Sequence, residues 1–174
     1  MDFTNIQAGD ILAVRGTGWF SRRILQLTGN SVSHIGLVVS TIPVILITEA
    51  LWRVKTRPID ESIAPAEHAY ILHPLNLRPE QTAEIVRSCI QFSADGYGVW
   101  DILMQLLDVT FKTSQFTDYN PFIGKHPICS AVAADAYASV GLTFGKKSWK
   151  SLSPADLYLY AKNNPEKYDV FEVK

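Results

Sequence analysis

Three residues that lie far apart in the sequence could together carry out nucleophilic chemistry. Cys129 stands where a proline-containing loop at 125–128 gives way to an alanine-rich helix. A thiol at a helix N-terminus meets the positive end of the helix dipole, which favours the nucleophilic thiolate over the thiol. Such a nucleophile needs a base, and His34 offers one at the start of an apolar strand. These residue types predict a cysteine–histidine pair that attacks a carbonyl carbon.

Glu49 is the candidate for a third member of this site. It is the lone carboxylate in the apolar run from Val44 to Leu51, and a buried carboxylate is costly unless it has a partner. If this run pairs with the strand that begins at His34, Glu49 can reach the second ring nitrogen and hold the imidazole in one tautomer. The resulting hypothesis is a catalytic triad of Cys129, His34 and Glu49.

Each of these residues also has an ordinary structural interpretation. Cys129 could be a small core residue, His34 a packed or hydrogen-bonded side chain, and Glu49 the polar end of a strand that points to water. Their spacing alone does not decide, because the three lie far apart in the sequence. His126 is a rival base, but a loop residue only three positions before Cys129 is poorly placed to face the thiol across a cleft.

The remaining cysteine and histidines predict neither a disulfide framework nor a metal site. Cys89 lies within the helical pattern of residues 85–90 and is expected to be a buried core residue. Two cysteines in the whole chain suit a reducing compartment. His68 and His73 are five residues apart and have no cysteine or carboxylate at ligand spacing, so neither zinc nor any other cofactor is expected.

Composition and charge describe a globular chain and exclude some classes of partner. With 47% hydrophobic and 19% charged residues, the 174-residue chain fits a single domain over residues 1–174. The net charge of −1 does not predict a nucleic-acid-binding face. The longest apolar stretch, at 35–47, is too short and too broken to span a membrane. The N-terminus lacks the features of a signal peptide, so a cytoplasmic location is expected, and the oligomeric state is left open.

The hydrophobic patterns place strands mostly in the first half of the chain and helices mostly in the second. Short apolar or alternating segments predict strands at 11–15, 34–40, 44–51, 53–57, 69–73 and 168–173. Helical spacing and helix-start signals predict helices at 19–27, 78–92, 99–111, 129–140 and 154–163. This order of elements predicts an α+β layered domain whose sheet is covered on both faces.

Four short motifs, in their order along the chain, resemble those of a known family. They are Gly9-Asp10-Ile11-Leu12, Ser33-His34-Ile35-Gly36-Leu37-Val38, Glu49-Ala50 and Cys129-Ser130. This order is similar to that of the circularly permuted branch of the NlpC-type papain-like superfamily. That branch includes the YiiX-like and YaeF-like amidases and, more distantly, lecithin retinol acyltransferase. Ordinary members have the cysteine before the histidine, whereas in this branch the histidine strand comes first, as it does here.

The resemblance implies a papain-like α+β fold in which a small, mostly antiparallel sheet packs against helices and the catalytic cysteine begins a helix. It implies that Cys129 is the nucleophile, His34 the general base and later acid, and Glu49 the residue that orients the imidazole. Tyr97 resembles the family's tyrosine upstream of the cysteine, and would line the site or stabilise the oxyanion beside the Cys129 N–H. The alternative for Tyr97 is a core aromatic at the start of a helix.

The function implied is that of a cysteine hydrolase. It would cleave an amide bond in a peptide or a peptidoglycan-derived peptide through a thioacyl-enzyme intermediate. One alternative is a lipid or lipoyl-amide deacylase or acyltransferase on the same triad, which the aromatic residues of 111–122 and Trp19-Phe20 would suit. Another is a non-catalytic ligand-binding member of the fold. The chain departs from many relatives at Ile128 and Ala131, where they have Tyr and Glu, and the substrate is expected to be a small peptide, amino-acid amide or acyl compound.

Overall fold

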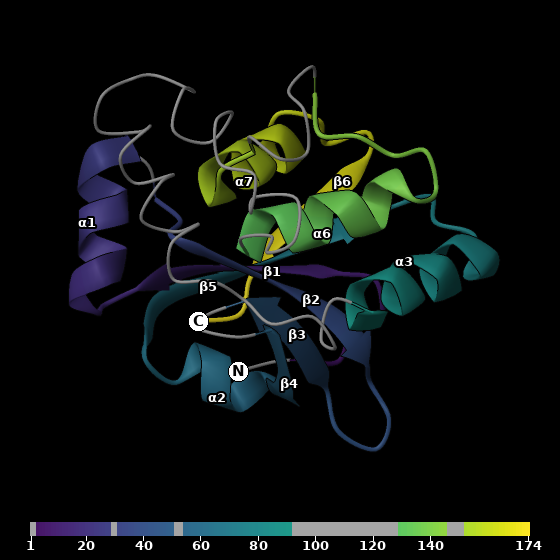
Figure 1. Cartoon of the computed structure of the whole chain (residues 1–174), viewed down its shortest axis with the longest axis horizontal. Helices are drawn as coiled ribbons and strands as arrows, with labels where there is room; N and C mark the ends of the chain where they lie inside the picture. The colour runs from purple at the N-terminus through teal and green to yellow at the C-terminus, as the bar shows by residue number, and fades with distance from the viewer. Residues whose placement is uncertain (1–2, 29–30, 51–53, 92–128, 146–151) are drawn as a thin grey trace.

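A six-stranded antiparallel sheet lies at the centre of the structure, in the order β4-β3-β2-β1-β5-β6 (Figure 1). The structure is a computed structural model, and it describes residues 3–28, 31–50, 54–91, 129–145 and 152–174. The strands are β1 Ile11–Gly16, β2 His34–Ser40, β3 Leu46–Ala50, β4 Val54–Pro58, β5 Ala66–Pro74 and β6 Tyr168–Glu172. The helices are α1 Trp19–Thr28, α2 Ile59–Ile63, α3 Pro79–Gln91, α6 Cys129–Ala138 and α7 Pro154–Lys162.

These elements confirm the predicted α+β class and differ from the expected pattern at a few places. β3 begins at Leu46, two residues later than predicted, and β5 begins at Ala66, three residues earlier. The short helix α2 was not predicted, because five residues between two prolines are too few for a helical period to show. The predicted helix at 99–111 lies outside the described residues.

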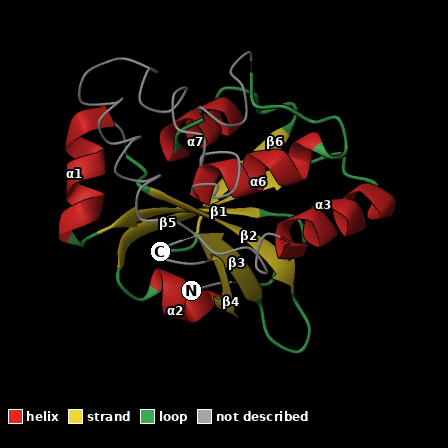
Figure 2. Ribbon diagram, viewed as in Figure 1, coloured by secondary structure: helices red, strands yellow, loops and turns green. Residues whose placement is uncertain are grey.

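The sheet is covered on both faces, as its apolar strands predicted. Ile11 and Ala13 of β1 face the cluster formed with α3, α6 and α7, whereas Leu12 and Val14 face the cluster that contains α2. Figure 2 shows α3, α6 and α7 on one side of the sheet and α2 on the other. Alternating residues of one strand therefore enter two separate cores.

The helix that begins at Cys129 is held tightly in the first of these cores. Most residues of α6 are buried, and its alanines allow the helix backbone to lie close to the sheet. At its far end, the hydroxyl of Tyr137 donates to the carbonyl of Gly9 at 2.6 Å. At its beginning, the hydroxyl of Ser130 donates to the carbonyl of Leu152 at 2.5 Å. Both ends of α6 are therefore tied to distant segments, which fixes the place of Cys129.

The helix α7 has a well-defined start immediately after Leu152. Ser153 and Asp156 form a reciprocal capping box, and Pro154 occupies the first turn. The Ser-Pro-Ala-Asp segment therefore fixes where α7 begins. None of the helices in the described part of the chain is long and apolar enough to cross a membrane.

Candidate functional site

His34 and Glu49 lie on neighbouring strands and project from the same face of the sheet. The register pairs Gly36 of β2 with Glu49 of β3. His34 precedes Gly36 by two residues, so its side chain emerges on the same face, diagonal to Glu49. The carboxylate Oε2 of Glu49 lies 2.6 Å from Nε2 of His34. The two strands pair as predicted, and the carboxylate meets the imidazole.

Gly36 leaves the room that this diagonal contact needs. A Cβ at Gly36 would lie 3.3 Å from Cγ2 of Ile47 and 3.5 Å from Cβ of Glu49. The first of these distances is tighter than an ordinary contact, so a side chain there would press on β3 beside Glu49. The Ser-His-Ile-Gly motif thus carries both the imidazole and the space next to it.

The second carboxylate oxygen of Glu49 is held by two residues that the sequence did not point to. Oε1 accepts hydrogen bonds from the guanidinium Nε of Arg57 on β4 and from the hydroxyl of Ser62 on α2, the latter at 2.7 Å. The Glu49 side chain is 0% exposed, so all its charge must be balanced by protein groups. The interpretation of Glu49 as a strand end that points to water is therefore wrong.

These contacts determine the protonation state of the carboxyl. Burial by itself would raise the pKa of Glu49. The hydrogen bonds and charge of His34, with the hydrogen bonds of Ser62 and Arg57, outweigh burial and lower this pKa to about 2. Glu49 is therefore ionised at neutral pH, although it is buried.

Cys129 lies on the other side of the imidazole, at the first residue of α6. Its thiol interacts with the His34 imidazole and with the backbone N–H groups of Ile35 and Ser130, and all three favour the thiolate. Since Nε2 of His34 is taken by Glu49, Nδ1 is the ring nitrogen left for the thiol. The three side chains form one continuous row of interacting groups from sulfur to carboxylate.

The electrostatics of this chain favour a thiolate–imidazolium pair. Burial would raise the pKa of Cys129, but the charge and hydrogen bond of His34 and the two backbone N–H groups lower it below the usual value. Burial would likewise lower the pKa of His34, but Cys129 and then Glu49 raise it to about 10. Opposite shifts in two contacting groups favour the form in which the proton has moved from sulfur to nitrogen.

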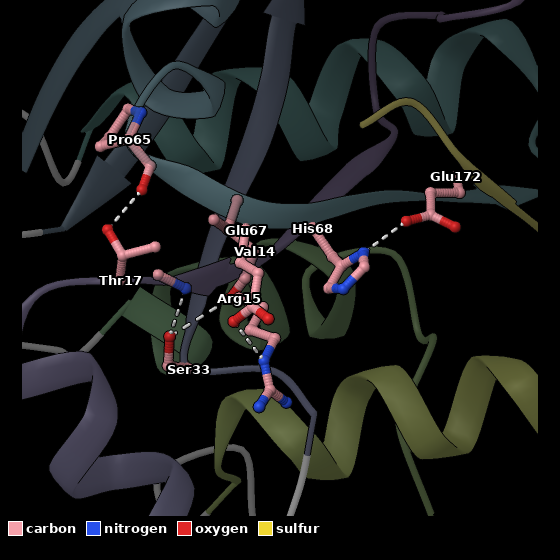
Figure 3. Close-up of polar contacts among 9 residues, drawn as sticks. Val14, Arg15, Thr17, Ser33, Pro65, Glu67, His68 and Glu172 are labelled. Carbon is pink, nitrogen blue, oxygen red and sulfur yellow. Dashed lines mark hydrogen bonds and ion pairs between the residues drawn. The ribbon is translucent and has the colours of Figure 1, made fainter.

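Ser33 fixes the start of β2 and therefore the place of His34 (Figure 3). Its hydroxyl accepts from the N–H of Gly16 at 3.0 Å and donates to the carbonyl of Val14 at 3.3 Å, and its own N–H donates to Val14 at 2.9 Å. Val14 is also the register partner of His34. Three hydrogen bonds thus hold the residue immediately before the imidazole.

Further polar contacts lie at this end of the sheet. Figure 3 shows the hydroxyl of Thr17 on the carbonyl of Pro65, Arg15 paired with Glu67, and His68 paired with Glu172. In the same order, the distances within these three pairs are 2.8, 2.9 and 2.7 Å. They join the end of β1 to the start of β5 and the end of β6.

The other candidate residues are not part of this chain of contacts. His73 pairs with the buried Asp10 at 2.8 Å, and Cys89 is buried in α3 with its pKa raised to about 12 by burial. In the described ranges, no group of three or more His, Cys, Asp or Glu residues could hold a metal ion. Tyr97 and His126 lie outside the described residues, so their roles stay predictions.

Arg57 could have been found from the sequence, whereas Ser62 could not. Once the strands at 44–51 and 53–57 are paired as neighbours, alternation places Arg57 on the face of Glu49, because Ile47 is its register partner. Ser62 reaches the carboxylate only through α2, which carries no periodic signal. The buried Glu49 carboxylate thus has three side-chain partners, of which His34 alone was expected.

Comparisons with known proteins bear on the fold. A scan against protein-family models finds no match, and a search of curated proteins finds none. Among solved structures, the chain is similar to the crystal structure of metalloprotein yiiX from Escherichia coli O157:H7, DUF1105, with a TM-score of 0.61 and 20% sequence identity. The similarity covers 80% of this chain and 69% of that chain. The described α+β architecture is therefore a YiiX-like fold.

Proposed function

We propose that this chain is a cysteine hydrolase of the circularly permuted papain-like type, with Cys129 as nucleophile, His34 as general base and acid, and Glu49 as the orienting residue. The observation that carries the proposal is the continuous row of interacting groups from the Cys129 thiol through His34 to the buried Glu49 carboxylate, which lies 2.6 Å from the imidazole. A nucleophile, its base and a group that orients the base are the parts that covalent acyl-transfer catalysis requires.

The proposed reaction begins with attack of the Cys129 thiolate on a carbonyl carbon. A sulfur–carbon bond forms, and the carbonyl electron pair moves to oxygen, where the N–H of Cys129 at the start of α6 would stabilise the oxyanion. As the oxyanion collapses, the carbon–nitrogen bond breaks and the imidazolium of His34 gives its proton to the leaving amine. Water then attacks the thioester while His34 takes its proton, the carbon–sulfur bond breaks, and release of the acid restores the thiolate–imidazolium pair.

Glu49 would act on this cycle through His34 alone. Its hydrogen bond to Nε2 keeps Nδ1 directed at the sulfur, and its charge stabilises the imidazolium that accompanies the thiolate. Tyr97 remains a proposed second oxyanion donor or substrate contact, as the family resemblance implies.

The proposed substrate is an amide in a peptide or a peptidoglycan-derived peptide, because the resemblance is to amidases. A deacylase or acyltransferase acting on an acyl substrate is the second candidate. The indole of Trp19, at the start of α1, is 76% exposed and would suit an apolar acyl chain. Both candidates use the same thioester chemistry and differ in the group delivered to Cys129.

The name of the structural neighbour raises the question of a metal ion, and the described donors do not fit one. Cys129 and His34 would supply two ligands. Both oxygens of Glu49 are already engaged, by His34 on one side and by Arg57 and Ser62 on the other. A resident zinc ion generally takes three or four protein ligands, so no step of the proposed reaction is routed through a metal.

Intact-mass spectrometry tests the proposal. The chain is incubated with two panels of probes, peptide 4-nitroanilides and 4-nitrophenyl esters of fatty acids, and Cys129→Ala serves as control. The expected result is release of nitroaniline or nitrophenol together with an acyl adduct on Cys129 that the control lacks. Turnover of anilides favours the amidase, and turnover of esters alone favours the acyl candidate. Retained binding of probes without any adduct or turnover would support a non-catalytic binder and contradict the proposal.

A further inference from the structure

The Glu49 carboxylate is enclosed by groups from three different elements. His34 of β2 contacts one oxygen, and Arg57 of β4 and Ser62 of α2 contact the other. With Cys129 as thiolate and His34 as imidazolium, the charges alternate in sign from the sulfur through the imidazolium and the carboxylate to the guanidinium. In such a row, each charge is stabilised by the opposite charge beside it. Removing the charge at either end, Cys129 or Arg57, leaves its neighbour inside the protein with one opposite charge fewer.

Resting on the proposed function, we infer that Arg57 and Ser62 are positioning residues that hold the Glu49 carboxylate charged and aligned behind His34, and so sustain the Cys129 thiolate from the opposite face of the sheet. Neither residue contacts the thiol in the described structure. Each acts on the site only through Glu49.

The geometry explains why Glu49 would need this support. A carboxylate can rotate about its last bond, and with Oε1 unbound the group would be free to turn away from the imidazole. Two donors on Oε1 leave Oε2 as the oxygen that faces His34. The Glu49 side chain has no exposed surface, so water does not supply either donor.

The positions of the two donors are themselves well anchored. Ser62 is buried in α2 between Ile59 and Ile63, which pack into the core on that face. The N–H of Ile59 donates to the carbonyl of Ile45 at 3.0 Å and joins α2 to the segment that leads into β3. Arg57 is held by its register opposite Ile47 and remains 27% exposed. The site is thus braced by a short helix that packs on the face opposite to α6.

Other charged groups near the carboxylate make no described contact with it. Lys55 of β4 is the register partner of Glu49 and is exposed. Asp60 and Glu61 of α2 are exposed as well. Their charges are screened by water, so Lys55 provides a matched control for the loss of a positive charge on the same strand.

The test measures the rate of Cys129 alkylation by iodoacetamide against pH in the full chain, with the adduct located by mass spectrometry. Arg57→Gln is expected to raise the apparent pKa of Cys129 by about one unit, which slows alkylation roughly tenfold at pH values below that pKa. Arg57→Lys keeps the positive charge but not the planar guanidinium, so it should slow alkylation less than Arg57→Gln does. Ser62→Ala should slow the reaction about threefold, less than Arg57→Gln, because it removes one neutral donor and no charge. Lys55→Gln should leave the profile unchanged.

A double variant separates positioning from general damage. If Arg57 acts through Glu49, then Arg57→Gln should add nothing in a Glu49→Gln background. An Arg57→Gln profile that matches the wild type, or full additivity in the double variant, would overturn the inference. Should Arg57→Gln fail to fold by circular dichroism, wild-type profiles in both Arg57→Lys and Ser62→Ala would overturn it instead. If the wild-type Cys129 itself alkylates no faster than a free thiol, it is the proposed function that fails, and the inference fails with it.

Discussion

The Glu49 carboxylate lies 2.6 Å from Nε2 of His34, on the neighbouring strand and with no exposed surface of its own. A buried carboxylate with this contact stays ionised and directs the other face of the imidazole to the Cys129 thiol. Four measurable consequences follow from this relationship and from the groups around it.

The two cysteines of the chain should react with iodoacetamide at very different rates. Cys129 has a lowered pKa and is partly exposed, whereas Cys89 is buried and its pKa is raised to about 12. At about pH 6 we expect Cys129 to be modified about a hundredfold faster or more, since the thiolate is the reactive form. Peptide mapping after timed alkylation measures both rates. Cys129→Ala should leave only the slow reaction, and equal slow labelling of both thiols in the wild type would contradict an activated Cys129.

Removal of the imidazole should shift the titration of the thiol. In His34→Ala, the apparent pKa of Cys129 should rise by more than about one unit, because a neighbouring imidazolium and its hydrogen bond are lost. The pH dependence of alkylation gives this value directly. His68→Ala is a matched control, since that imidazole pairs with Glu172 outside the site, and it should leave the profile in place. An unchanged profile in His34→Ala would make His34 a structural residue.

Glu49 should contribute to stability in a defined range of pH. Its pKa falls from 4.5 to about 2 on folding, so the folded state binds this proton less readily than the unfolded state. The stabilisation is fully present above about pH 4.5 and is lost as the pH falls toward about 2; it amounts to roughly 3 kcal/mol.

Urea unfolding of the wild type and of Glu49→Gln at several pH values tests this contribution. The difference in the free energy of unfolding between the two proteins should shrink as the pH is lowered through this range. A difference that stays constant with pH would show that the carboxyl is not ionised in the fold. The buried Asp10, whose pKa is raised chiefly by burial, changes the pH dependence of stability in the opposite direction. Asp10 is present in both the wild type and Glu49→Gln, so its effect cancels in their difference.

Gly36 should tolerate a side chain poorly because of its place beside Glu49. A Cβ there would lie 3.3 Å from Cγ2 of Ile47, and the larger Gly36→Val side chain would force β2 and β3 apart. We expect a loss of about 1–3 kcal/mol in the free energy of unfolding and slower alkylation of Cys129. Thermal or urea unfolding measures the first and the alkylation assay the second.

A matched substitution shows whether the Gly36 effect is local. A Cβ added at Gly18 would meet open space. Gly18→Val should therefore change the free energy of unfolding and the rate of Cys129 alkylation much less than Gly36→Val does. If both glycines behave alike, the contact between the strands does not depend on the space at Gly36.

Much of the fold was predictable because its signals are local. The strands at Ile11–Gly16 and His34–Ser40 carry continuous apolar runs that suit a sheet buried on both faces. The helix at Pro154–Lys162 carries a capping box and an early proline. The five-residue helix α2 and the full length of β5 were missed, because neither has a distinctive period of its own.

The sequence by itself determined the chemical types in the site. A cysteine at a helix start, a histidine at a strand start and a lone carboxylate in an apolar strand made Cys129, His34 and Glu49 candidates. The family resemblance of the surrounding motifs then favoured a triad over the structural interpretation of each residue. A carboxylate in such a strand must find a partner, and this requirement holds in any fold that buries it.

Only the tertiary structure decided which groups meet these residues. The pairing of β2 with β3 brings His34 to Glu49, the packing of α6 on the sheet brings Cys129 to His34, and β4 with α2 brings Arg57 and Ser62 to the far oxygen. These contacts join residues 8 to 95 positions apart. Two of them, Cys129 with His34 and Ser62 with Glu49, depend on how a helix packs against the sheet rather than on any local pattern. A hydrogen bond acts only at contact distance, so the partner of a buried charge is determined by packing across the whole chain.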